Sequence, residues 1–306
     1  MTTKGLVSSF QDYSTKDGPG LRQTVFLKRC NLQCLWCSNP ETLRGGEDLM
    51  FFPERITNAE LALKENDGAL SRAGQHWEVD RGLLGKPDQV MEQNTMRLFE
   101  TVGEWIEPGE CTRRLLRSKA FYDTSGGGVT FSGGEPMLQA SFISEVQALL
   151  AEHNVHIAID TAGHVPWSEF DKVLDRTDLF LFDIKAADSE LHRRLTGVGN
   201  ERILENARRL AQEATEIWIR LVLVPGLNDS PGDLHGRLQI AADMGECVTR
   251  VDILGYHSLG VGKYQRLGRA YQLGKVPAPD QSLLDEAIAY ASSLGLPIHY
   301  EPGVTA

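Results

Sequence analysis

The feature that most constrains the fold is a regular alternation of apolar runs and helical segments from about residue 111 onward. The run Leu179–Phe182 is apolar at every position, which is typical of a strand covered on both faces, as in a parallel sheet. Parallel strands joined by right-handed helical crossovers either curl into a barrel or stack as a doubly wound sheet. The pattern predicts an α/β fold and leaves these two architectures open.

Six strands are expected to alternate with helices, and a short strand is expected near the end of the chain. The expected strands span 23–27, 128–131, 155–159, 179–182, 217–224, 248–254 and 297–300. The expected helices span 111–121, 140–153, 167–176, 201–213, 231–244 and 281–294, and 91–105 is a further candidate helix.

Three of the five cysteines, Cys30, Cys34 and Cys37, lie within eight residues with the spacing C-x3-C-x2-C. Three thiolates on one loop can bind a metal centre from one side, but structural zinc sites and fully ligated 4Fe–4S clusters need a fourth ligand. A cubane held by three thiolates keeps one iron open for an outside ligand. The alternatives are unrelated core cysteines and a zinc site completed by a distant histidine.

The composition limits the classes of partner. The chain has 306 residues and a net charge of -11 without a basic patch, so neither nucleic acid nor an anionic membrane surface is expected to bind it. No apolar run reaches the length of a membrane span or a signal peptide. An odd cysteine count with a tight cluster fits a reducing cytoplasm better than a disulfide framework.

Residues 41–110 differ from the rest in charge and periodicity. They carry seven basic and fifteen acidic side chains, a net charge of -8. We interpret 42–110 as an inserted subdomain between two parts of one core, 1–41 and 111–306, with the acidic residues on a solvated face. Cys111, which stands alone, is interpreted as structural.

The carboxyl ends of the expected strands carry polar groups. One such group could be a helix cap, but the carboxyl ends of parallel strands meet at one edge of the sheet, so several groups there argue for one site. The groups are the cysteines, Glu135, Asp160, Asp183 with Lys185, and His257.

The amino and carboxylate groups of S-adenosylmethionine (SAM) could complete the open iron. Gly133, Gly134 or Glu135 could accept from its ammonium group, or simply form a tight turn. Other side chains could contact the rest of SAM, each with a structural alternative such as a cap, a salt bridge or core packing. These are Asp160 and Asp183 for ribose hydroxyls or a small cation, Lys185 for a carboxylate, Arg220 and His257 for the ligand, and Trp36 for the adenine.

In combination, the motifs resemble the radical SAM superfamily and, within it, the glycyl radical enzyme activating enzymes of the pyruvate formate-lyase activator type. The cysteine motif has an aromatic residue, Trp36, before its last cysteine. The other resembling stretches are 14–22, 37–41, 121–136, 183–185, 224–226 and 256–257, and the resemblance covers 5–41 and 115–275.

The resemblance implies a partial (β/α)6 barrel with the acidic insert, one 4Fe–4S cluster on the three cysteines, and abstraction of a glycine α-hydrogen from a partner glycyl radical enzyme. It also implies a flavodoxin or ferredoxin-type electron donor. Asp17 is expected to meet the partner's glycyl loop. The expected cofactor-binding residues are Trp36, Ser38, Asn39, Gly133, Gly134, Glu135, Asp183, Ile184, Lys185, Arg220 and His257, with Asp160 and Thr161 matching a monovalent cation position.

The sequence departs from the family pattern in two places. The insert has no cysteine before Cys111, so we predict no auxiliary cluster. Arg29 precedes Cys30 where a glycine is usual. The alternative functions are a radical SAM enzyme that acts directly on a small molecule or another peptide, and a cluster-binding or zinc-binding protein without catalysis.

Overall fold

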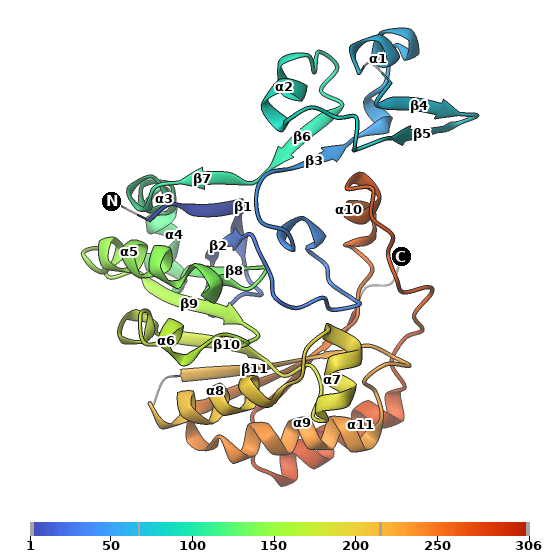
Figure 1. Ribbon diagram of the computed structural model, residues 1–306. Coiled ribbons are helices and arrows are strands. Elements are labelled where there is room, and N and C mark those ends of the chain that lie inside the picture. The colour runs from blue at the N-terminus through green and yellow to red at the C-terminus, as the bar shows by residue number, and fades with distance from the viewer. Residues whose placement is uncertain (1–2, 67, 214–215, 304–306) are drawn as a thin grey trace.

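The core of the protein is a nine-stranded sheet of order β13-β12-β11-β10-β9-β8-β2-β1-β7 (Figure 1). This computed structural model describes residues 3–66, 68–213 and 216–303. Neighbouring strands from β2 to β13 run parallel, whereas β1 pairs antiparallel with both β2 and β7. The strands are β1 (Gly5–Ser14), β2 (Arg22–Leu27), β7 (Glu104–Ile106), β8 (Gly128–Gly133), β9 (His156–Thr161), β10 (Leu179–Asp183), β11 (Glu216–Leu223), β12 (Val248–Gly255) and β13 (Ile298–Glu301).

Helices cover the outer face of this curved sheet and enclose the main hydrophobic core (Figure 1). Their apolar faces supply core residues such as Phe142, Leu210 and Leu284. The helices of this layer and of the loops are α3 (Pro108–Leu115), α4 (Lys119–Ser125), α5 (Ala140–Ala151), α6 (Trp167–Phe170), α7 (Ser189–Thr196), α8 (Glu201–Gln212), α9 (Pro231–Asp243), α10 (Val261–Arg266) and α11 (Gln281–Ser293).

Strand β10 shows why the expected strands are continuously apolar. Phe180 and Phe182 point into the main core, whereas Leu179 and Leu181 belong to a separate cluster on the other face of the sheet. Because both faces of this strand are buried, apolar residues are favoured at every position before Asp183.

The two ends of the sheet curve towards each other. Lys16, in the turn after β1, forms a 2.7 Å ion pair with Glu301 at the end of β13. The parallel strands with their outer helices therefore form a partial barrel, which confirms the predicted α/β fold class.

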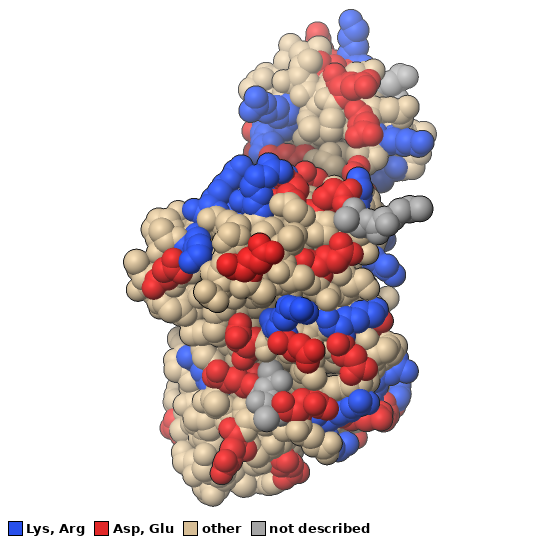
Figure 2. Space-filling view, turned by 90° about the vertical axis from the view of Figure 1, so that its left-hand side faces the viewer, with Lys and Arg blue, Asp and Glu red and all other residues tan. Residues whose placement is uncertain are grey.

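The segment between β2 and α3 contains a small subdomain that projects from the core (Figures 1 and 2). It has its own hydrophobic cluster, which includes Phe51, Leu70 and Phe99. β7 already belongs to the large sheet, so the projecting part ends before residue 104. The subdomain consists of β3 (Asp48–Phe51), α1 (Ala59–Glu65), β4 (Leu70–Ala73), β5 (His76–Val79), α2 (Pro87–Glu92) and β6 (Phe99–Val102).

Several expected elements differ from those observed. The candidate helix over 91–105 is wrong, because the Asn94 side chain bonds the backbone of Phe99 and turns the chain into β6 and β7. The single helix expected over 111–121 is divided into α3 and α4 by a 3-10 turn at Leu116–Ser118. β1, α7 and α10 were not predicted. In the part of the chain that the structure describes, no helix is long and apolar enough to span a membrane.

Candidate active site

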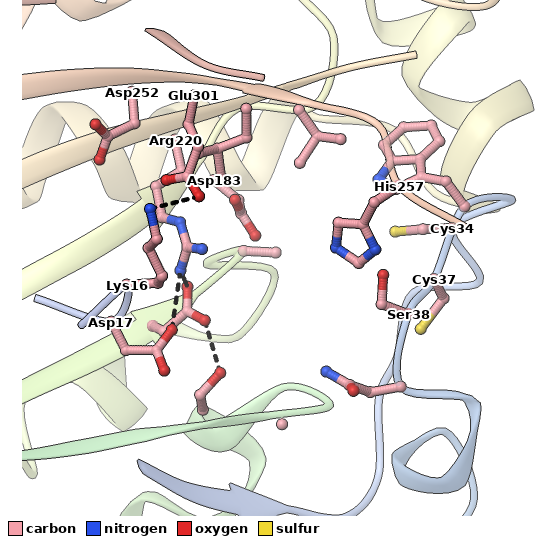
Figure 3. A pocket seen from close by; sticks show the side chains of 18 of the residues that line it. Lys16, Asp17, Cys34, Cys37, Ser38, Asp183, Arg220, Asp252, His257 and Glu301 are labelled. Atoms are coloured by element: carbon pink, nitrogen blue, oxygen red, sulfur yellow. Dashed lines mark hydrogen bonds and ion pairs between the residues drawn. The ribbon is translucent and has the colours of Figure 1, made fainter. Parts of the chain in front are cut away.

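A cavity of about 770 Å³ lies at the carboxyl edge of the sheet. The cysteine loop lies at one end, and charged side chains from β9, β10, β11, β12 and β13 line the rest (Figure 3). All predicted site residues line this cavity except Glu135, Thr161 and Ile184. The residues that do so are Asp17, Cys30, Cys34, Trp36, Cys37, Ser38, Asn39, Gly133, Gly134, Asp160, Asp183, Lys185, Arg220 and His257.

The cysteine loop is held in place by backbone hydrogen bonds to distant segments. Cys30 N donates to Leu43 O at 3.2 Å, and Gln33 N donates to Thr196 O at the end of α7 at 2.7 Å. These bonds satisfy the backbone of an irregular segment that otherwise has few partners. They fix the direction in which the loop presents its cysteines.

The thiols of Cys30, Cys34 and Cys37 form no disulfide and face the cavity. Burial raises the pKa of all three thiols, to about 11 for Cys34. Metal binding would therefore release protons from this loop. Among the described residues, no three His, Cys, Asp or Glu side chains converge on a single ion. A 4Fe–4S cubane does not require such convergence, because each cysteine binds a different iron.

The residue before the first cysteine has a backbone conformation that favours glycine. Arg29 has a φ of 77°, in the left-handed region that favours glycine. This conformation directs Arg29 O to the Glu135 N–H, which donates to it at 2.8 Å. At Gly134, a Cβ atom would lie 2.2 Å from Arg29 O. The glycine at 134 is therefore required by contact with the cysteine loop.

Glu135 is fully buried beneath the cavity floor. Its carboxylate accepts hydrogen bonds from the Thr161 hydroxyl at 2.6 Å, from Met137 N at 3.0 Å and from Ala162 N at 3.0 Å. Burial raises the pKa of Glu135 to about 7, against the effect of these donors. The carboxylate thus links the segment after β8 to the end of β9. Ile184 is also buried, between two residues that face the cavity.

Charges of both signs meet at the centre of the cavity. Arg220 Nη1 lies 3.9 Å from Asp17 Oδ1 (Figure 3) and 3.1 Å from Asp160 Oδ1. Lys185 Nζ donates to Asp183 Oδ2 at 2.9 Å. Burial alone lowers the pKa of both cations, but the neighbouring carboxylates outweigh it and raise both pKa values. Burial raises the pKa of Asp160 despite Arg220.

Two buried polar atoms facing the cavity have no hydrogen-bond partner among the described residues. They are Asp160 Oδ1, which has only its ion pair, and His257 Nδ1. Together with the paired charges and three thiols, they provide donors and acceptors for an amino acid zwitterion beside a metal centre. The residues present therefore fit a 4Fe–4S cluster with SAM.

Residues around the cysteines have further supports. Trp36 packs with Tyr256 and Leu195 in a small apolar cluster and also lines the cavity. Asn39 Oδ1 accepts a 2.9 Å hydrogen bond from Lys263 Nζ. His257 and Ser38 lie next to Cys34 and Cys37 in Figure 3, and burial lowers the pKa of His257.

Asp17 is fixed within its own turn. Its Oδ2 accepts hydrogen bonds from Ser14 Oγ and Thr24 Oγ1, both at 2.7 Å. These bonds hold the turn between β1 and β2 at the cavity wall.

A polar group at the far end of the cavity was not predicted from the sequence. Asp252 Oδ1 lies 2.7 Å from Arg250 Nε and 3.2 Å from His299 Nδ1. No motif marked these residues, since they alternate with apolar residues along strands. Lining residues that were not predicted include Trp218, Arg250, Asp252, His299 and Glu301.

The fold and the cysteine-lined cavity define the class of enzyme. The sequence profile of the radical SAM superfamily matches residues 94–236. A radical SAM methyltransferase from Sphaerobacter thermophilus has a similar fold, with a TM-score of 0.53 and 14% identity over 98% of this chain and 77% of that chain. The protein has the architecture of a radical SAM enzyme.

Curated relatives narrow the class. The isethionate sulfite-lyase activating enzyme of Nitratidesulfovibrio vulgaris is 34% identical over 90% of this chain and 91% of its own length. The pyruvate formate-lyase-activating enzyme of Staphylococcus aureus is 34% identical over 95% of this chain and 97% of its own. This chain belongs to the glycyl radical enzyme activating enzymes of the radical SAM superfamily. Membership implies a 4Fe–4S cluster and SAM as its cofactors.

Proposed function

We propose that Cys30, Cys34 and Cys37 hold a single 4Fe–4S cluster and that the enzyme abstracts an α-hydrogen from one glycine of a partner glycyl radical enzyme. The observation that carries this proposal is the presence of the three thiols and the charged cluster in one cavity, in a chain of this family. When bound and reduced, the cluster supplies the electron that cleaves SAM to methionine and a 5′-deoxyadenosyl radical.

The charged residues hold and orient SAM in this proposal. Asp183 and Asp160 offer acceptors to its amino group and ribose hydroxyls, while Lys185 and Arg220 offer positive charge to its carboxylate. Because these charges are already paired and buried, little reorganisation accompanies binding. His257, with its unpartnered Nδ1, adds a hydrogen-bonding group on the cysteine side.

Other predicted residues have indirect roles. Gly134 and Glu135 position the cysteine loop through their contacts with Arg29, and Thr161 holds the Glu135 carboxylate. Asp17 fixes the turn that faces the incoming glycyl loop. A monovalent cation at Asp160 remains a prediction. Arg220 already brings positive charge to that carboxylate, so the cation would share Asp160 with this ion pair.

We also propose that the enzyme is cytoplasmic and takes electrons from a flavodoxin or ferredoxin-type donor. In this proposal it holds no auxiliary cluster and binds neither nucleic acid nor membranes. Five free cysteines support a reducing compartment. A single cluster is tested by anaerobic reconstitution and iron analysis, with about four irons per chain expected.

The activity is tested by adding SAM and dithionite to the reconstituted protein. We expect 5′-deoxyadenosine from the wild type and none above background from Cys34→Ala. With a glycyl radical enzyme as partner, we expect an electron paramagnetic resonance doublet on that partner. Formation of 5′-deoxyadenosine without a doublet would favour direct action on a small molecule. If the wild type forms no 5′-deoxyadenosine, radical SAM catalysis is excluded.

A further inference from the structure

Two of the most exposed large apolar side chains lie at the mouth of the active-site cavity. Tyr13 is 57% exposed and Leu259 is 68% exposed, yet both line the cavity. A side chain that lines a cavity and is more than half exposed must lie at its entrance. Isolated exposed apolar residues are common, but two at one entrance indicate a binding surface.

The backbone of Tyr13 directs its ring to this position. Tyr13 has a φ of 59°, which bulky residues rarely adopt, and the β1–β2 pairing shifts register between Gln11 and Ser14. The ring packs edge-to-face on Phe121 of α4, with centroids 5.1 Å apart and planes at 85°. Phe121 is itself 44% exposed, so the pair forms an apolar surface rather than a buried contact.

The Tyr13–Phe121 pair and Leu259 lie next to different parts of the active site. α4 is linked to the turn that contains Asp17, since Leu21 N donates to Ser125 Oγ at 2.9 Å. Leu259 precedes Gly260, where a Cβ atom would lie 2.8 Å from Ser38 Cα in the cysteine loop. Tyr13 therefore marks the Asp17 side of the entrance, and Leu259 marks the cysteine side.

The charges at the entrance are compensated. Lys16 and Glu301 both line the cavity and pair with each other at 2.7 Å. An entrance with apolar residues and a neutral ion pair fits a polypeptide segment with apolar side chains better than a strongly charged one.

We propose that Tyr13, supported by Phe121, and Leu259 are docking anchors for the polypeptide that delivers the glycine, and that apolar side chains flank that glycine in the partner. This inference rests on the proposed function. A glycine inside a partner protein can reach the cavity only on a continuous segment of chain, which must pass this entrance. Burying these two anchors would then contribute mainly to partner affinity.

The test compares Tyr13→Ser, Leu259→Ser and the double variant with matched controls. The controls are Trp105→Ser and Leu83→Ser, which are 54% and 62% exposed and do not line the cavity. The partner probes are pyruvate formate-lyase, isethionate sulfite-lyase and trans-4-hydroxy-L-proline dehydratase, of which the one giving a glycyl radical doublet with the wild type is used. The rate of radical formation is measured against partner concentration and normalised to partner-free 5′-deoxyadenosine formation by the same variant.

We expect the KM for the partner to rise about tenfold in the double variant and to stay within about twofold of wild type in both controls. An unchanged KM in the double variant, an equal rise in the controls, or a loss that disappears on normalisation would overturn the inference. A wild type that cleaves SAM but gives no doublet with any of the three partners would overturn the proposed partner class and this inference together.

Discussion

The left-handed backbone of Arg29 predicts that replacing this residue with glycine stabilises the protein. Arg29 is exposed, its φ is 77°, and its side chain lies against Gly45, where a Cβ would be 3.2 Å from Arg29 Cγ. The left-handed conformation costs an L-residue about 1–2 kcal/mol. Glycine loses about 0.5–1 kcal/mol more chain entropy on folding than alanine.

The control variant Arg29→Ala removes the same side chain but keeps the unfavourable backbone. The difference between the two costs predicts that Arg29→Gly is about 0.5–1 kcal/mol more stable than Arg29→Ala. Urea unfolding of the cluster-free protein under reducing conditions measures this difference from midpoints at equal slopes. The Glu135 N–H bond to Arg29 O should remain, because it depends on the backbone alone.

Equal stability of the two variants, or a less stable glycine variant, would refute this reasoning. It would mean that the loop changes conformation when Arg29 is removed. The inference that this backbone conformation favours glycine would then fail.

Three further predictions concern buried charges. Burial raises the pKa of Glu135 from 4.5 to about 7, so the folded state binds the carboxyl proton more tightly than the unfolded state does. The stability of the wild type relative to Glu135→Gln should therefore fall as the pH rises from 4.5 to 7. Urea unfolding at each pH measures this difference. Arg220→Met leaves Asp160 without its cation and should destabilise the protein by about 3–5 kcal/mol, whereas Arg220→Lys should recover part of this loss. Lys28 is fully buried and joins the core to Asp48 of the subdomain, so Lys28→Met should accelerate proteolysis within 48–102. Each prediction has a result that would contradict it. These are a stability difference between wild type and Glu135→Gln that does not change with pH, an Arg220→Met variant as stable as the wild type, and an unchanged proteolysis rate within 48–102 in Lys28→Met.

The sequence predicted the parts of the fold that local pattern controls. Strands such as β10 were found because burial on both faces makes the whole run apolar. β1 was missed because its second half, up to Ser14, is largely polar and exposed. Helix α7 is short, and its amphipathic pattern, with Leu191 and Leu195 among charges, was not recognised.

The site was predicted where chemistry follows a motif or a strand end. The cysteines, Asp160 and Asp183 all line the cavity, where converging carboxyl ends were expected to bring them. Arg220, from the middle of β11, lines it as well. Glu135 was expected there too, but Thr161 at the end of β9 and Ala162 just after it hold the Glu135 carboxylate below the cavity floor. Such a contact depends on tertiary packing, which the sequence pattern does not specify.

The Lys16–Glu301 pair illustrates the same limit. The two residues lie 2.7 Å apart although almost the whole chain separates them. Each is an ordinary exposed charge when considered alone. Only closure of the curved sheet shows that they share the cavity entrance.

The central claim is transfer of a glycine α-hydrogen from a partner protein to the 5′ carbon derived from SAM. Its most direct test uses a partner glycyl radical enzyme labelled with α-deuterated glycine, mixed anaerobically with this enzyme, SAM and reductant. Mass spectrometry should show one deuterium in each 5′-deoxyadenosine molecule formed by this transfer. It should show none when the partner's radical glycine is replaced by alanine. Undeuterated 5′-deoxyadenosine from a labelled partner that has acquired its radical would contradict the account.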